Sequence, residues 1–304
     1  KNVKSGTMTP DEKTALKLNI GKIPELMLDN TDRNRTSPFA FTGNKFEFRA
    51  VGSTANGATP MIALNTIIAK QLGDFKESVD ERIKKGEKKD MAILKELQAL
   101  IKDSKKIRFE GNGYGDEWVK EAEKRGLSNL KDTPRAVQKV SEAKFVNLFR
   151  DMGIFTEIEY HARQEIQLDM YTLQIQIEGR MLGDLAQNHV IPAVVAYQNQ
   201  LIKNITGIKD IFGDKEYKSM AYTQLSVLEE LSEHLSKVKK ILEKMLNNRK
   251  KANKIEDPFK KASAYCDTVK IHFDEIAYHL NKLEILTDDK LWPLPKLREL
   301  LFTK

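Results

Sequence analysis

Cysteine is almost absent from this chain, since Cys266 is the only one among 304 residues. A single thiol excludes an intrachain disulfide framework and fits a reducing compartment, so we expect a cytoplasmic protein. Long apolar runs are also missing, because no segment approaches the roughly 20 consecutive apolar residues of a transmembrane helix. The sequence therefore predicts no membrane span.

Nucleic-acid motifs are missing as well. The net charge is +7, from 51 Lys and Arg against 44 Asp and Glu, which permits attraction to phosphates without requiring it. The lysine pairs fall near expected helix ends with no aromatic residues between them, so we interpret them as solvated surface and expect no nucleic acid. The alternative, a basic nucleic-acid-binding protein, would bind any duplex with strong salt dependence.

Helical periodicity dominates the chain after Gly52. A helix is expected over 58–85, with Gly86 as its stop. Its apolar face holds Met61, Leu64, Ile67, Ile68 and Leu72. Shorter helices are expected over 90–103, 116–125, 133–140 and 141–151.

Long helices are expected from Thr156 onward. The first runs over 156–203 with a kink at Pro192, the second over 215–248, and the third starts at Asp257-Pro258. The second has bundle spacing at Leu228, Leu231, Leu235, Val238, Leu242 and Met245. The third has it at Ala262, Cys266, Val269, Phe273, Ile276, Leu280 and Leu283. A last short helix is expected over 295–302.

The region before Gly52 differs in character. Thr9-Pro10 is typical of a helix start, so a short helix is expected to about Leu18. Gly43-Asn44 is a two-residue hairpin signal between strands expected over 38–42 and 45–51. The sequence thus predicts a mainly α protein with a short β-hairpin followed by a long-helix bundle, divided into domains 1–153 and 154–304.

The second hairpin strand alternates full charges with aromatic rings. Lys45, Glu47 and Arg49 share one face, and Phe46 and Phe48 share the other. A salt-bridge ladder on a surface strand is one interpretation. The other is a site for a divalent metal and a polyphosphate, because a carboxylate between cations suits both ligands.

The surrounding motif resembles the glutamine synthetases. It consists of Asn34-Arg35-Thr36-Ser37, then Lys45-Phe46-Glu47-Phe48-Arg49, then Ala55-Asn56 with Pro60. The family pattern is Asn-Arg-Ser, a variable loop, (Arg or Lys)-x-Glu-x-Arg, and a helix opening with Ala-Asn-Pro. The run 32–56 is similar to the type III enzymes, the large bacterial form, and the resemblance extends over most of the chain.

The resemblance implies a role for each matching residue. Glu47 matches a carboxylate ligand of Mg²⁺ or Mn²⁺, and Arg49 matches the catalytic arginine that holds the substrate glutamate. Arg35 matches a catalytic arginine on the nucleotide phosphates, and Lys45 stands where a phosphate-contacting Arg or Lys is found. A second phosphate-binding arginine of the family is not evident; Ala40 lies near its place.

What the family does is implied in the same way. ATP is a substrate, and glutamate and ammonium are joined to form glutamine through γ-glutamyl phosphate, in a large ring-type homo-oligomer. The family's other metal ligands and its ammonium-binding aspartate lie upstream of the Asn-Arg-Ser motif. Only about 30 residues precede Asn34 here, so we expect a C-terminal portion that is inactive alone, with a remnant of the catalytic domain in 1–153.

Weaker candidates remain. The five histidines lack the spacing of metal ligands, and we interpret them as core or surface residues. Cys266 falls on the predicted bundle seam as an apolar filler. The glycines of 111–115 are typical of an ordered turn, with a phosphate cradle or an intersubunit loop as alternatives. For the whole chain, a non-enzymatic helical scaffold or partner-binding module is the alternative to the ligase.

Overall fold

The structure is a computed structural model. It describes residues 15–16, 26–27, 39–41, 45–48, 55–109, 113, 115–296 and 298–302. Among these residues, no helix is both long enough and apolar enough to cross a bilayer. Two compact units are present: the N-terminal unit, up to 130 with 143–157, and the C-terminal unit, 131–142 with everything from 158 onward. The predicted domain boundary after residue 153 stays a prediction.

Short strands come first in the N-terminal unit. Strands β1 (Ala15–Leu16) and β2 (Leu26–Met27) pair antiparallel, as do β3 (Phe39–Phe41) and β4 (Phe46–Phe48). The predicted hairpin is therefore confirmed. The helix predicted to reach Leu18 is wrong at Ala15 and Leu16, because these residues form a strand pairing that local propensity cannot anticipate; the rest of that helix lies outside the described residues.

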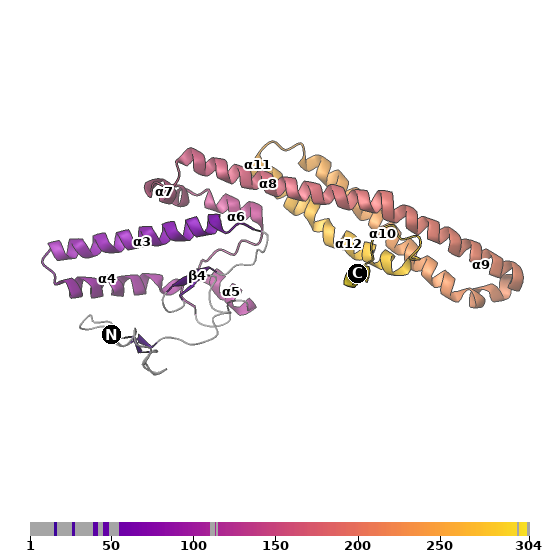
Figure 1. The fold of residues 1–304 in the computed structure, drawn as a ribbon, viewed down its shortest axis with the longest axis horizontal. Helices are drawn as coiled ribbons and strands as arrows, with labels where there is room; N and C mark the ends of the chain where they lie inside the picture. The colour runs from indigo at the N-terminus through magenta and orange to yellow at the C-terminus, as the bar shows by residue number, and fades with distance from the viewer. Residues whose placement is uncertain are drawn as a thin grey trace. The chain divides into compact units, whose positions relative to one another are not determined.

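The helices of the N-terminal unit begin with α3 (Ala58–Lys84) and α4 (Lys89–Asp103), which lie side by side (Figure 1). Gly86, with φ of 92°, ends α3 as predicted, because this conformation strains residues that carry a Cβ. Helix α5 (Asp116–Lys124) and helix α7 (Ala143–Asp151) complete the unit, and α7 packs on α3.

The core of the N-terminal unit is small. Val79, Ala92, Val146 and Phe149 are its buried apolar residues among those described. The predicted apolar face of α3 is only partly covered: Leu64 and Ile68 are half-buried, whereas Met61 is 48% exposed, Ile67 49% and Leu72 63%. Periodicity shows that a face is apolar and not that a neighbour covers it.

The C-terminal unit is a long-helix bundle. Its elements are α6 (Thr133–Val140), α8 (Glu157–Asp184, whose first residue belongs to the other unit), the π-helical turn η3 (Leu185–Val190), α9 (Ile191–Met220), α10 (Tyr222–Ala252), α11 (Pro258–Ala264), the π-helical turn η4 (Tyr265–Val269), the 3₁₀ turn η5 (Lys270–His272) and α12 (Phe273–Leu286). Helix α10 packs against α9 and α12 (Figure 1). The predicted mainly α fold with a long-helix bundle is confirmed.

Several boundaries differ from the predictions. The π-helical turn η3 precedes Pro192, whose ring and missing N–H disturb the helix at this point. The first long helix does not end near residue 203 but continues to a break at Gly213, where φ is 75°. The third predicted helix is divided by η4 and η5, and the last is only the 3₁₀ turn η6 (Glu299–Leu301) within its described residues.

The bundle core follows the predicted seams. On α10, Leu231, Val238, Leu242 and Met245 are fully buried. Val269, Ile276 and Leu283 of η4 and α12 are fully buried in the same core, whereas Ala262 of α11 is fully buried in a second cluster with Val137 and Leu168. Cys266 is only half-buried, whereas its neighbour Tyr265 is fully buried. Tyr265, three residues after Ala262 and four before Val269, thus takes the fully buried seam position, and the predicted inward position of Cys266 is only partly realised.

Candidate functional site

The charged strand of the hairpin is β4, which begins directly after Lys45. Register pairs Ala40 of β3 with Glu47 of β4. The rings of Phe39 and Phe46 stack with centroids 4.9 Å apart and planes at 15°. Phe46 is nevertheless 53% exposed. The hairpin therefore holds its strands together through this aromatic contact while one side of the rings stays accessible.

Lys45 and Glu47 are brought together as the alternation predicts. The Lys45 Nζ lies 3.6 Å from the Glu47 Oε1, and the two side chains are 66% and 36% exposed. An exposed pair of this kind contributes little to stability. The same exposure leaves both side chains accessible to a ligand, so the geometry is compatible with the salt-bridge interpretation and with the metal–phosphate interpretation.

Arg35 and Arg49 lie outside the described residues. The grouping of these two arginines with Lys45 and Glu47 therefore stays a prediction, and so do the roles that the resemblance implies for all four. Sequence periodicity alone placed Lys45 beside Glu47, because alternate residues of a strand share a face.

The hairpin offers Glu47 as a donor group for a divalent metal. Carboxylate oxygen is the kind of ligand that Mg²⁺ prefers, so the Glu47 side chain is chemically suited to bind this ion. Within the part of the chain that the structure describes, no three or more His, Cys, Asp or Glu residues form a group able to hold a metal ion. Glu47 would thus supply one ligand, with the others coming from phosphate, water or residues not described.

The glycine-rich segment leads into α5. Gly115 precedes the helix in an extended conformation, and the ring of Trp118 stacks on Phe109 with centroids 4.0 Å apart. The Arg125 guanidinium lies 5.4 Å from the centre of the Trp118 ring and donates to the Arg108 carbonyl at 2.8 Å. These contacts connect the described residues on either side of the segment; residues 110–112 and 114 lie outside the described residues, so the turn stays a prediction.

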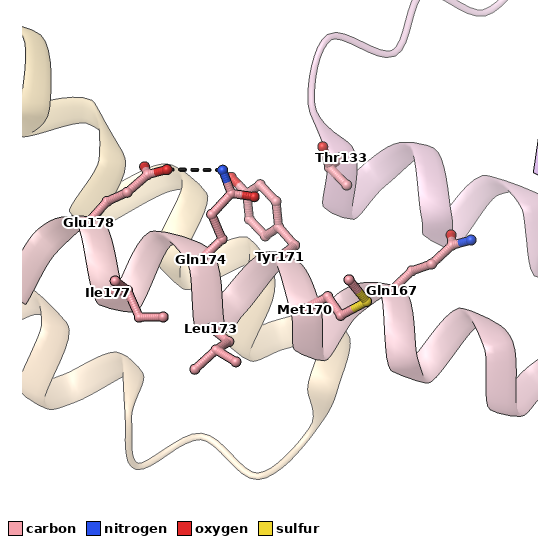
Figure 2. A pocket seen from close by; sticks show the side chains of 8 residues that line it. All are labelled: Thr133, Gln167, Met170, Tyr171, Leu173, Gln174, Ile177 and Glu178. Atoms are coloured by element: carbon pink, nitrogen blue, oxygen red, sulfur yellow. Dashed lines mark hydrogen bonds between the residues drawn. The ribbon is translucent and has the colours of Figure 1, made fainter. Parts of the chain in front are cut away.

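An open groove of about 610 Å³ runs along α8 in the C-terminal unit (Figure 2). Its wall consists of Thr133, Gln167, Met170, Tyr171, Leu173, Gln174, Ile177 and Glu178. Gln174 donates to Glu178 at 2.9 Å. Burial, with a smaller effect of the neighbouring Cys266 thiol, raises the pKa of Tyr171, so its hydroxyl stays protonated. Among the described residues, the wall lacks paired acids or bases and includes neither Lys45 nor Glu47.

One polar contact was not anticipated from the sequence. His234 of α10 and His279 of α12 meet with their Nδ1 atoms 2.8 Å apart. Spacing along one helix does not reveal this contact, because the two histidines are 45 residues apart. His234 precedes the seam residue Leu235, and His279 precedes the seam residue Leu280. This position beside the seam is the feature of the sequence that could have indicated the contact.

A helical bundle preceded by a hairpin that carries adjacent Lys and Glu side chains defines a mainly α protein with an exposed, charged candidate site. Residues 92–209 match the family Glutamine synthetase C-terminal domain. The chain is 48% identical over 304 residues to a glutamine synthetase of Bacteroides fragilis, covering all of this chain and 42% of that protein.

Two further relatives agree. A type-3 glutamine synthetase of Dictyostelium discoideum is 34% identical over 287 residues, covering 94% of this chain and 39% of the relative. A glutamine synthetase of Butyrivibrio fibrisolvens is 36% identical over 287 residues, covering 90% and 38%. The chain thus spans about two fifths of the length of these relatives. The resemblance to glutamine synthetases is confirmed, and the coverage is consistent with a C-terminal portion.

Proposed function

We propose that this chain is part of an ATP-dependent glutamate–ammonia ligase that makes glutamine through γ-glutamyl phosphate. The observation that carries the proposal is the 48% identity with a glutamine synthetase along the whole chain. The hairpin supports it, because the Lys45 ammonium and the Glu47 carboxylate lie 3.6 Å apart at an exposed edge. In the whole protein we expect a cytoplasmic, ring-type homo-oligomer with ATP, glutamate and ammonium as its substrates.

Each of the four site residues would bind the ligand that suits its side chain. Glu47 would bind Mg²⁺ or Mn²⁺, which neutralises phosphate charge when bound. Lys45 and Arg35 would bind the nucleotide phosphates. Arg49 would orient the glutamate carboxylate through its planar guanidinium, which matches a carboxylate in two hydrogen bonds. Positive charge held around a migrating phosphoryl group stabilises its transition state more than an acid or a base does.

The test is phosphate release by the longest natural chain that contains this segment. It is measured with ATP, Mg²⁺, glutamate and ammonium, each omitted in turn. We expect release to require all four, and Glu47→Ala to abolish it while circular dichroism and the melting temperature stay unchanged. Glu123→Ala, which removes an exposed carboxylate on α5, is the matched control and should retain activity.

Two results would contradict the proposal in different ways. Near wild-type activity in Glu47→Ala would remove the metal-ligand role but leave the ligase. No glutamate-dependent release by the parent protein would favour the helical scaffold. We also propose that the 304-residue chain alone is inactive, and glutamine formation by that chain would refute this part.

A further inference from the structure

The His234–His279 contact joins two helices of the bundle. The rings have centroids 5.1 Å apart and planes at 48°, and the Nδ1 atoms are separated by 2.8 Å. Two nitrogens at this distance need a hydrogen between them, so one Nδ1 donates and the other accepts. A neutral pair satisfies this requirement when one ring has its proton on Nδ1 and the other has it on Nε2.

The surroundings of the pair combine burial with both signs of charge. His279 is 6% exposed, whereas His234 is half-buried. The Tyr278 ring lies 5.1 Å from the His279 ring and 6.4 Å from the His234 ring, between centroids. The titratable or charged groups facing the pair are Glu233 and Lys237 from α10, with Glu275, Tyr278 and Lys282 from α12.

These groups limit how many protons the pair can accept. One added proton keeps the contact, because a charged ring still donates from Nδ1 to its neutral partner, and Glu233 and Glu275 favour the charge. A second proton leaves an N–H on both nitrogens and no acceptor between them. It also places two cations within contact distance beside Lys237, in a partly buried site where like charges repel strongly.

We propose that the His234–His279 pair is a pH-sensitive contact, which holds α12 against α10 while at most one ring is charged and is broken when both are. Loss of this contact should strongly affect the stability of the C-terminal unit, because α10 and α12 share its main core. Acidification would thus loosen the bundle at this seam.

The direction of the pH dependence follows from proton counts. Burial first, then the charges of His234 and Lys237, lower the pKa of His279 below its ordinary 6.5. At His279 the unfolded chain therefore binds more proton than the folded chain once the pH falls below about 6.5. The contribution of this group to stability is then fully present above that pH and falls as the solution becomes more acidic.

The first experiment measures melting temperature from pH 8 to pH 5 for the 304-residue chain. We expect the wild type to lose stability below about pH 6.5. His279→Asn keeps an amide near the Nδ1 position but cannot be protonated, so its pH dependence should be less than half as steep. His189→Gln, which removes an exposed histidine of η3, is the control and should keep the wild-type slope.

A second measurement does not depend on the variant folding. A ¹⁵N–¹⁵N scalar coupling across the hydrogen bond between the two Nδ1 atoms is expected at pH 7.5, with loss of that signal on acidification. A wild-type slope in both His279→Asn and His234→Asn, or no such coupling at pH 7.5, would overturn the proposal. Stabilisation by added Zn²⁺ that either variant abolishes would also overturn it, because the pair would then be a metal-binding site.

Discussion

Helices α3 and α10 have similar apolar patterns and opposite burial. On α10, Leu231, Val238, Leu242 and Met245 are fully buried, because α9 and α12 cover them. On α3, Leu72 is 63% exposed, and the buried residues of the helix are Thr66 and Val79. The comparison teaches that apolar spacing predicts a helix and its contact face, whereas burial depends on a partner element that the pattern does not identify.

The two units also differ in the size of their buried apolar cores. The C-terminal unit has a continuous core that extends through α8, α9, α10 and α12. The N-terminal unit has only a few buried apolar residues among those described, and an ion pair between Arg82 and Glu96 joins α3 to α4. We therefore expect core substitutions to unfold the C-terminal unit and to affect the N-terminal unit less.

The largest expected difference is between two leucines. Leu242→Ala in α10 removes a fully buried side chain and should lower the free energy of unfolding of the C-terminal unit by about 2–5 kcal/mol. Leu72→Ala in α3 is the matched control and should cost no more than about 0.5 kcal/mol. Urea denaturation followed by circular dichroism measures both. Equal effects would mean that the exposed face of α3 is covered in solution.

A medium effect is expected at the start of α6. The Asp132 Oδ1 accepts from the Arg135 backbone N–H at 2.9 Å, which caps the helix. Asp132→Ala should therefore destabilise the C-terminal unit by about 0.5–2 kcal/mol. The control is Asp116→Ala in α5, where Gly115 precedes the helix without a side-chain cap. A smaller loss in Asp132→Ala than in the control would refute the capping role.

The cap also has its own pH dependence. Burial acts to raise the pKa of Asp132, but hydrogen bonds from the Arg135 backbone and side chain outweigh it and lower the pKa below 3.8. The stabilisation is then complete above pH 3.8 and is lost only as the pH falls further. This cap should therefore contribute no loss of stability between pH 6.5 and 5, where the histidine pair is expected to act.

The smallest expected effect concerns the ion pair of the N-terminal unit. The Arg82 Nε donates to the Glu96 Oε2 at 3.1 Å, and the side chains are 34% and 15% exposed. A double-mutant cycle with Arg82→Ala and Glu96→Ala should give a coupling free energy of about 1 kcal/mol. The exposed Lys70–Asp74 pair on α3 is the control, with a coupling of about 0.3 kcal/mol. Similar coupling free energies for the two pairs would show that partial burial does not strengthen the ion pair between Arg82 and Glu96.

The sequence by itself determined most of the helices, the seam of α10 and the hairpin. Gly43-Asn44 between two apolar runs predicted the antiparallel pair, and the 3- and 4-residue spacing on α10 predicted its buried face. Alternation also placed Lys45 beside Glu47, and the motif around them led to the glutamine synthetases. All of these depend on residues close together along the chain.

Only the tertiary structure decided the rest. Tyr265 is fully buried in the main core whereas Cys266 beside it is half-buried, and this choice depends on packing against several helices at once, which local spacing does not encode. The exposure of α3 and the meeting of His234 with His279 depend on which elements become neighbours. Such contacts join residues far apart in the sequence, so their free energy is a property of the folded arrangement and not of any one segment.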